Sequence, residues 1–318
     1  MNTQEKIGVL LLNLGGPERP EDVRPFLLNL FSDRDIIRLG PPFMQKIIAR
    51  IIATRRAPKS RANYAKIGGG SPIRAKTEEQ ARALEDALTP AGSFIVRSCM
   101  RYWHPFAGEA LAQMREAGVD RLIALPLYPH YSIATTGSSV TDLKAQMNRM
   151  QLQLPLEVIE AWPEQTEFIA ALATRITEGI ASFAGAEVEL VYSAHSLPVQ
   201  FIEEGDPYVE HLKQTIAALE AQTKVQGRLC YQSRSGPVQW LGPALPEVIE
   251  AIATQGGKNI LVVPISFVSD HVETLYEIDI EYRQLAENLG MGFRLTRALN
   301  ADPQFIASLA ALVREKCA

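Results

Sequence analysis

The stretches RLIALPLYP (residues 121–129) and NILVVPISF (residues 259–267) decide the fold that we expect for this chain. In both, a helix end with a glycine and a basic residue leads into an apolar run typical of a buried strand, and the run reaches a proline. The two stretches are offset by 138 residues. This internal repeat predicts two halves of similar build.

Short apolar runs alternate with helical patterns through the rest of the chain, which indicates an α/β protein with mostly parallel strands. The predicted strands are residues 7–14, 94–100, 121–127 and 156–161, then 188–192, 228–232, 259–265 and 293–297. Helical patterns include residues 208–223, 274–289 and 303–317, with Asp302 as a candidate N-cap for the last. We expect two similar domains, residues 1–152 and 153–318, each with a parallel sheet of about four strands flanked by helices. The last helix is a candidate to pack back on the first domain, and an active-site cleft is expected between the domains.

The composition is that of a folded protein and excludes several classes of function. Hydrophobic residues make up 47% and charged residues 21%, and 32 bases against 36 acids give a net charge of −4, which disfavours binding to nucleic acid. Cys99, Cys230 and Cys317 form no CxxC pair, as is typical of a reducing cytosol. The first apolar run lacks a cleavage pattern, and no window approaches the roughly 18 apolar residues of a membrane span. A cytoplasmic protein is therefore predicted.

Residues 41–56, PPFMQKIIARIIATRR, have an apolar and basic pattern with two interpretations. One is an amphipathic helix at a membrane surface, which predicts peripheral contact with the inner face of the cell membrane. The favoured interpretation is a helix whose apolar stripe packs into the core. The glycine motifs NLGGPERP (13–20) and IGGGSP (67–72) match neither GxGxxG nor a P-loop, which disfavours nucleotide binding.

Two features place chemistry at strand ends of the second half. His195 follows a strand in the turn SAHSLP, an address where parallel sheets bind ligands, although a lone histidine is as often structural. From Asp270 to Glu281 there are five acids and no Lys or Arg, and Glu273, Glu277 and Glu281 recur at every fourth position. A solvated acidic face is the simpler explanation of such a run. A row of carboxylates that enters a cleft would instead pass a divalent cation along it or accept protons. The imidazole of His195 and the carboxylate of Glu273 would together supply two ligands, a set that suits the transfer of Fe²⁺, Co²⁺ or Zn²⁺.

Motifs along nearly the whole chain then resemble those of the ferrochelatases, enzymes that insert Fe²⁺ into a porphyrin to make haem. The motifs are LLLNLGGPE (10–18), FLLNLFSDRDII (26–37), RRAPKS (55–60), YAKIGGGSPI (64–73), MRYWHP (100–105), PLYPHYSIATTGSS (126–139), YSAHSLP (192–198), GDPY (205–208), YQSRSGPVQWLGP (231–243) and SFVSDHVETLYEIDIEY (266–282). The family fold of two Rossmann-like domains agrees with the expectation above. The resemblance implies a lyase that converts protoporphyrin IX and Fe²⁺ to protohaem with release of two protons, the terminal step of haem biosynthesis.

The resemblance also assigns residues to roles. It implies that His195 and Glu273 are the catalytic pair, with His195 as base or metal ligand, and that Glu273, Glu277 and Glu281 carry metal or protons. The motifs also carry over substrate-binding residues: near the porphyrin propionates these are Arg56, Tyr64 and Ser71, with Arg55 as a weaker candidate. The implied pocket walls are Leu14, Tyr102, Ile133 and Trp240. The implied orienting residues are Arg101 and Asp270.

Some members of the family hold a [2Fe–2S] cluster on four cysteines, three of them in a C-terminal extension. Here Ile133 stands where those members have cysteine, and Cys317 alone precedes the end of the sequence, so we expect no cluster and a monomer. Two enzymatic alternatives remain, namely insertion of Fe²⁺ into coproporphyrin and a cobalt or nickel chelatase of the same fold. A non-catalytic haem carrier is the alternative from another class, although a carrier has no use for the acidic row.

Overall fold

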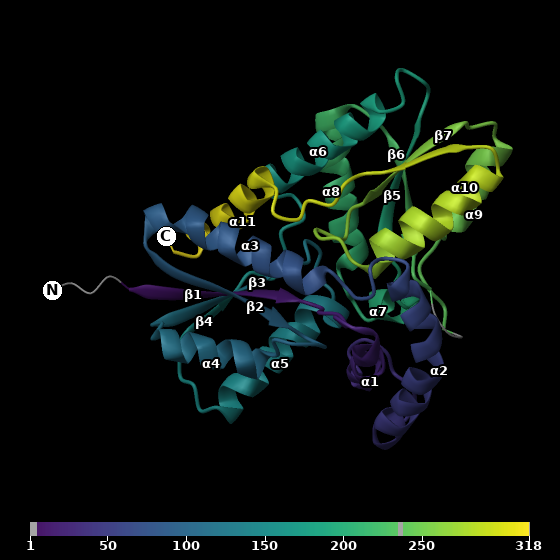
Figure 1. Ribbon diagram of the computed structural model, residues 1–318. Coiled ribbons are helices and arrows are strands. Elements are labelled where there is room, and N and C mark those ends of the chain that lie inside the picture. Colours follow the sequence, from purple (N-terminus) through teal and green to yellow (C-terminus); the bar gives the residue numbers. More distant parts are fainter. Residues whose placement is uncertain (1–4, 235–237, 318) are drawn as a thin grey trace. The chain divides into compact units, whose positions relative to one another are not determined.

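The computed structural model describes residues 5–234 and 238–317 (Figure 1). The chain divides into two compact units: unit 1 contains Met1–Ala161 and Asn300–Ala318, and unit 2 contains Trp162–Leu299. Each unit holds one four-stranded parallel sheet with helices on its faces. The predicted α/β fold with two similar halves is confirmed.

In unit 1 the strand order is β2-β1-β3-β4. The elements of its sheet and its flanking helices are β1 (Lys6–Asn13), β2 (Ser93–Met100), β3 (Arg121–Pro126), β4 (Leu156–Val158), α3 (Ile73–Leu88), α4 (Ala107–Ala117), α5 (Ser138–Arg149) and α11 (Pro303–Glu315). Helices α4 and α5 cover one face of the sheet, and α3 with α11 cover the other (Figure 1). Leu10 and Leu12 of β1 are buried against Leu111 and Met114 of α4, because the strand alternates its side chains between two apolar layers.

The boundary between the units differs from the expected one at residues 152 and 153. Strand β4 pairs in parallel with β3, so it belongs to the first sheet, and the polar stretch before it is only the connection from α5. Helix α11 also belongs to unit 1 and packs against α3, where Arg314 donates a hydrogen bond to the Ala87 carbonyl (2.8 Å). Asp302 caps α11 as predicted, since its carboxylate accepts from the Gln304 N–H (2.9 Å).

Unit 2 repeats the strand order of unit 1, as β6-β5-β7-β8. Its elements are β5 (Glu189–His195), β6 (Gly227–Gln232), β7 (Asn259–Pro264), β8 (Gly292–Leu295), α6 (Thr166–Ala181), α7 (Val199–Glu203), α8 (Tyr208–Thr223), α9 (Leu245–Thr254) and α10 (Arg283–Asn288). Val191 and Cys230 of the sheet pack with Ile249 of α9 and Ala286 of α10. The repeated stretches at 121–129 and 259–267 contain β3 and β7, which occupy the same place in the two sheets.

Two helical segments after strands are π-helices, η4 (Ile133–Gly137) and η5 (Glu273–Tyr282). The α-helix predicted at 274–289 is therefore wrong in its first part. The backbone N–H of Arg283 reaches back five residues to the Ile278 carbonyl, and α-helical bonding begins only with α10. The π-helix is a rare form that is frequent at functional sites.

Unit 1 also contains α1 (Val23–Ser32), α2 (Gln45–Ala65) and the single 3₁₀ turns η1 (Pro20–Asp22), η2 (Pro42–Met44) and η3 (Thr89–Ala91). The favoured prediction that the apolar stripe of residues 41–56 packs into the core is wrong. The buried face of α2 contains Ala49 and Ala53, whereas Phe43, Ile47 and Ile51 are 79%, 60% and 47% exposed. Within residues 5–234 and 238–317, no helix combines the length and the apolarity that crossing a bilayer requires.

Candidate active site

The predicted catalytic pair lies at the carboxyl ends of two neighbouring strands of unit 2. His195 is the last residue of β5, and Glu273 is the first residue of η5, which follows β7. The imidazole Nδ1 of His195 lies 2.7 Å from Oε2 of Glu273. The backbone of His195 is fixed from both sides, because its N–H donates to Oγ of Ser266 (3.1 Å) and its carbonyl accepts from the Tyr208 hydroxyl (3.0 Å). The structure thus brings these two predicted residues into direct contact.

Ser233, which follows β6, joins this pair and was missed by the sequence analysis. Its hydroxyl donates to Oε2 of Glu273 (2.8 Å) and also lies in hydrogen-bond contact with Oε2 of Glu277, while its backbone N–H donates to Oε1 of Glu277 (2.8 Å). The Tyr282 hydroxyl donates to the same Oε1 of Glu277 (2.7 Å). The strand-end rule that selected His195 would have selected Ser233 had it been applied to β6, which is the neighbour of β5.

The charges of these groups are strongly coupled. Burial acts to lower the pKa of His195, but the charge of Glu273 and its hydrogen bond outweigh burial and raise that pKa above 6.5. Burial acts to raise the pKa of Glu273, yet the charge and hydrogen bond of His195 hold it well below its ordinary value of 4.5. The pKa of Glu277 is raised, first by burial and then by the charge of Glu273. The site therefore contains one carboxylate that favours the ionised form and one that resists it.

Burial decreases along the acidic row of η5. The Glu273 side chain is 19% exposed, Glu277 is half-buried and Glu281 is exposed. The fourth acid, Asp279, forms an ion pair with Arg283. The interpretation of the run as a uniformly solvated acidic face is therefore wrong for Glu273 and Glu277.

A second imidazole beside the pair was also missed. His271 is 5% exposed, its ring lies against that of Phe267 with centroids 4.0 Å apart and planes tilted by 51°, and its Nδ1 lies 3.2 Å from Oγ1 of Thr274. Burial lowers its pKa, although the charges of Glu273 and Asp270 oppose the shift. Asp270 is thus close enough to act on this ring.

Trp240 is half-buried. Its segment pairs in antiparallel fashion with residues 197–199, which follow His195 in the chain. In this pairing the N–H of Leu241 donates to the Leu197 carbonyl (3.0 Å). Its motif, YQSRSGPVQWLGP, includes residues 235–237, which lie outside the described residues.

In unit 1, Leu14, Arg101 and Tyr102 come together at the carboxyl ends of β1 and β2, where the Tyr102 N–H donates to the Leu14 carbonyl (2.9 Å). Oδ2 of Asp33 accepts from Nη2 of Arg101 and from the Tyr102 hydroxyl, both at 2.7 Å, and from Oγ of Ser138 at 2.5 Å. Tyr102 is only 1% exposed. The Tyr102 ring is thus enclosed, and its hydroxyl is bound to Asp33.

The remaining predicted residues of unit 1 lie on α2, on η4 and in the loop before α3. Helix α2 contains Arg55, Arg56 and Tyr64. Both arginines are exposed, whereas Tyr64 is buried. The guanidinium of Arg56 lies 5.4 Å from the centroid of the Phe31 ring. Ser71 follows the triple glycine, and its N–H donates to the Pro17 carbonyl (2.7 Å). Ile133 begins η4 and is 38% exposed.

Groups of possible metal ligands were sought throughout the described part of the chain. Among the residues that the structure describes, no three His, Cys, Asp or Glu side chains form a group that could hold a metal ion.

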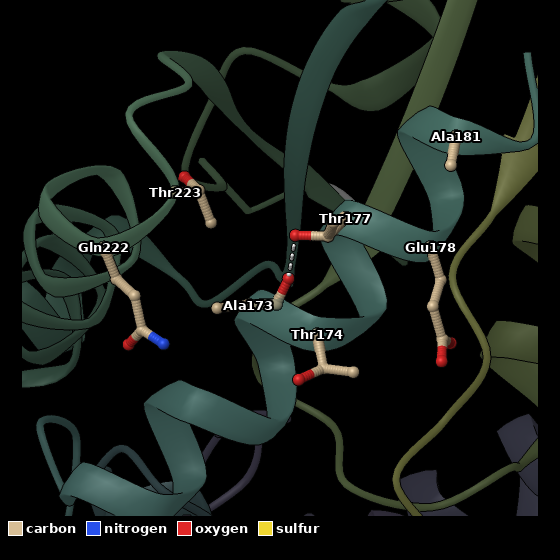
Figure 2. Close-up of a pocket in the computed structure, with 7 residues that line it drawn as sticks. All are labelled: Ala173, Thr174, Thr177, Glu178, Ala181, Gln222 and Thr223. Carbon is tan, nitrogen blue, oxygen red and sulfur yellow. Dashed lines mark hydrogen bonds between the residues drawn. The ribbon is translucent and has the colours of Figure 1, made fainter. Parts of the chain in front are cut away.

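A surface pocket of about 470 Å³ between α6 and the end of α8 contains none of the predicted site residues. Figure 2 shows it with Thr177 donating to the Ala173 carbonyl, and Thr174 and Thr223 donate to carbonyls of their own helices in the same way. These hydroxyls are already engaged, and the other polar side chains that line the pocket are those of Glu178 and Gln222.

Known proteins resemble the chain over nearly its whole length. A family model described as Ferrochelatase matches residues 6–317. The chain belongs to the ferrochelatase family. It is 58% identical over 308 residues to a protein named Ferrochelatase from Desulfotalea psychrophila, covering 97% of this chain and 96% of that one. A Ferrochelatase from Geotalea uraniireducens is 51% identical over 314 residues, covering 98% of each chain. The ferrochelatase reaction is the insertion of Fe²⁺ into a porphyrin for haem synthesis.

Solved structures show the fold alone. A structure described as SirB from Bacillus subtilis with Fe³⁺ has a TM-score of 0.59 and 14% identity, covering 98% of this chain and 96% of that chain. A sirohydrochlorin chelatase SirB from Bacillus subtilis subspecies spizizenii in complex with cobalt has a TM-score of 0.58 and 13% identity, covering 98% and 94%. At such identities the likeness confirms the two-sheet α/β fold and carries no statement about the metal.

Proposed function

We propose that the chain inserts Fe²⁺ into protoporphyrin IX and releases two protons to give protohaem, as a lyase of the ferrochelatase family. The observation that carries this proposal is the contact between His195 and Glu273 at the ends of adjacent parallel strands. A porphyrin must lose two N–H protons as the metal enters, so the reaction needs a base close to the metal. A paired imidazole and carboxylate supply that base and two weak ligands for the iron that is the substrate.

Each member of the cluster has a proposed part in this reaction. Neutral His195 accepts a pyrrole proton, and ionised Glu273 stabilises the imidazolium that results. Glu277 and Glu281 lead from the half-buried pair to the exposed end of η5, and we propose that protons or the incoming cation follow this row. Asp270 acts on the orientation and charge of His271 beside the pair.

Substrate binding is proposed for the exposed arginines and the apolar positions. Arg55 and Arg56 are exposed and cationic, as recognition of propionate groups requires, with Ser71 and Tyr64 as further contacts. Leu14, Ile133 and Trp240 supply apolar surface to the macrocycle. For Arg101 and Tyr102 we propose a supporting role through Asp33.

The experiment that tests this function is anaerobic incubation of the purified protein with a porphyrin and one divalent metal at a time. Protoporphyrin IX and coproporphyrin are compared with Fe²⁺, Co²⁺, Ni²⁺ and Zn²⁺, and insertion is followed optically. The proposal predicts the highest kcat/KM for Fe²⁺ with protoporphyrin IX. Preference for coproporphyrin would change the substrate, preference for Co²⁺ or Ni²⁺ would change the metal, and haem binding without any insertion would leave a carrier.

We also propose peripheral contact of α2 with the anionic inner face of the cell membrane, by a chain that is otherwise cytoplasmic. Residues 36–77 contain ten Lys or Arg and no Asp or Glu, in a protein whose net charge is −4. Phe43, Ile47 and Ile51 are exposed at every fourth position of the same segment. Exposed apolar side chains among cations suit a surface of anionic lipid.

Vesicle sedimentation tests the membrane proposal. Phosphatidylglycerol vesicles should bind the wild type, and a variant with serine at positions 43, 47 and 51 should remain in solution. Leu289→Ser is the matched control, because Leu289 is 43% exposed but lies in unit 2. Equal binding of the wild type to neutral phosphatidylcholine vesicles would refute the role of charge.

We propose that the chain acts as a monomer without an iron–sulfur cluster. The pair, Ser233 and the acidic row all come from one copy of unit 2, so one chain supplies the catalytic groups. Cys99 and Cys230 are buried in the cores of different units, whereas Cys317 is exposed. Sedimentation equilibrium together with iron and acid-labile sulfide analysis tests both statements.

A further inference from the structure

Ser233 has an unusual backbone for a residue that carries a Cβ. Its φ is 68°, in the left-handed region that favours glycine. Such conformations persist only where the surrounding structure maintains them, and they cluster at functional sites. The residue lies directly after β6, beside His195 on β5.

This conformation lets one residue engage two carboxylates of η5. Its hydroxyl contacts Oε2 of Glu273 and Oε2 of Glu277, and its backbone N–H donates to Oε1 of Glu277. The Glu273 oxygen that accepts from Ser233 is the same one that lies 2.7 Å from Nδ1 of His195. The hydroxyl therefore fixes the oxygen that faces the imidazole.

We propose that Ser233 is a positioning residue of the metal-insertion site, which fixes Glu273 against His195 and sets its spacing from Glu277. The proposal rests on the proposed function. Ser233 touches neither iron nor porphyrin in this proposal and acts only through the carboxylates. Oε2 of Glu273 has two hydrogen-bond partners, Nδ1 of His195 and the hydroxyl of Ser233. The side chain of a glutamate rotates about several bonds, so without the Ser233 hydroxyl it can adopt orientations in which Oε2 no longer contacts the imidazole.

Ser233→Gly separates positioning from stability. Glycine relieves the left-handed backbone, so the melting temperature should stay the same or rise. The hydroxyl is lost, so kcat for Fe²⁺ insertion should fall about 10- to 100-fold, with the KM for protoporphyrin IX unchanged. Ser233→Ala should lower kcat equally and also lower the melting temperature, because it loses the same hydrogen bonds without the relief of strain that offsets their loss in Ser233→Gly.

Lys224→Gly is the matched control. Lys224 ends α8 with a φ of 59°, so glycine relieves the same backbone conformation, and the side chain is exposed. Its kcat should equal that of the wild type. A Ser233→Gly protein with a wild-type kcat, or a Ser233→Gly loss accompanied by an equal loss in Lys224→Gly, would overturn the proposal.

A readout without turnover keeps the test independent of the proposed function. Protein labelled with ¹⁵N-histidine should show a downfield Nδ1–H proton for His195 bonded to Glu273, assigned by its absence from His195→Ala. Ser233→Gly should shift or broaden this signal, and Lys224→Gly should leave it unchanged. If the wild type inserts no metal but the signal responds as stated, the proposed function fails and the positioning role stands. If the signal is identical in wild type and Ser233→Gly, the positioning role fails.

Discussion

Gly70→Ala should destabilise unit 1 because two glycine-containing loops pack against each other without space for a Cβ. A Cβ on Gly70 would lie 2.1 Å from the carbonyl oxygen of Glu18, whereas real Cβ atoms stay beyond 3.0 Å, and the obstacle is backbone rather than a flexible side chain. The neighbouring N–H of Ser71 donates to the Pro17 carbonyl at 2.7 Å, so separating the loops also stretches that hydrogen bond. Close packing thus accounts for Gly70, whereas Gly68 and Gly69 of the same motif have open space around them and a positive φ.

The magnitude follows from these two losses. Overpacking costs about 1–3 kcal/mol and a hydrogen bond about 0.5–1.5 kcal/mol, so we expect about 3 kcal/mol in total. For a unit of about 180 residues this corresponds to a fall in melting temperature of roughly 6–12 °C. Thermal unfolding followed by circular dichroism measures the shift.

Gly108→Ala is the control for this prediction. Gly108 lies in α4, and the nearest atom to an added Cβ is Oε1 of Gln146 at 3.7 Å, an ordinary contact. Alanine should therefore stabilise the helix by up to about 1 kcal/mol. If Gly70→Ala melts within 2 °C of the wild type (our threshold, on the order of 1 kcal/mol), the loops are not packed as described and the reasoning is refuted.

Three further substitutions test the electrostatics. Asp33→Asn should cost about 2–4 kcal/mol at pH 7, because Arg101 loses its partly buried partner. Burial acts to raise the pKa of Asp33, but hydrogen bonds from Ser138 and Tyr102 and the charge of Arg101 outweigh burial and lower that pKa. The Asp33 carboxylate therefore stabilises the fold above pH 3.8, and this stabilisation is lost as the pH falls further. Urea unfolding at pH 7 and below pH 4 should show that the difference in unfolding free energy between the wild type and Asp33→Asn shrinks at the lower pH. Burial and the charge of Asp33 raise the pKa of Asp35, which means that the fold disfavours its ionised form. Asp35→Asn should therefore leave the free energy of unfolding unchanged or increase it in the same assay. A loss of stability equal to that of Asp33→Asn would contradict this account. Glu273→Gln should move the acid limb of the kcat/KM profile to lower pH, because burial then lowers the pKa of His195 against the charge of Glu277 alone. An unmoved limb would show that His195 is not the titrating base.

The strand pattern was predictable because buried strands of parallel sheets are continuous apolar runs. The 138-residue repeat marked β3 and β7, and the same strand order in both sheets explains why a repeat exists. The strand at 156–161 was predicted, but its place in the first unit was not, because its pairing with β3 is a long-range contact that no local pattern reports.

The site was predictable only in part. His195 and Glu273 were found because strand ends and a charge run are visible in the sequence. The π-helix was missed because Leu275, Ile278 and Tyr282 fit an α-helical stripe as well. Ser233 and Asp33 were missed because their roles depend on hydrogen bonds between segments about 40 to 105 residues apart, which no local pattern reports.

The outward face of α2 shows the limit of amphipathic patterns. Bulky apolar residues at helical spacing predict a buried stripe, but alanines form the buried face here, and α2 packs against α1. A sequence pattern gives the period of a helix, whereas the face that is buried depends on the size of the side chains that its neighbour can accept.

The most direct test of the central claim is the rate of haem formation from protoporphyrin IX and Fe²⁺ under anaerobic conditions, measured for the wild type, His195→Ala and Glu273→Gln, with porphyrin binding measured in parallel. The account predicts rapid haem formation by the wild type, a loss of about 100-fold or more in kcat for both variants, and porphyrin affinity within a few-fold of the wild type. Wild-type turnover by Glu273→Gln would contradict the role of the pair. Tight haem binding without turnover by the wild type would contradict the enzyme itself.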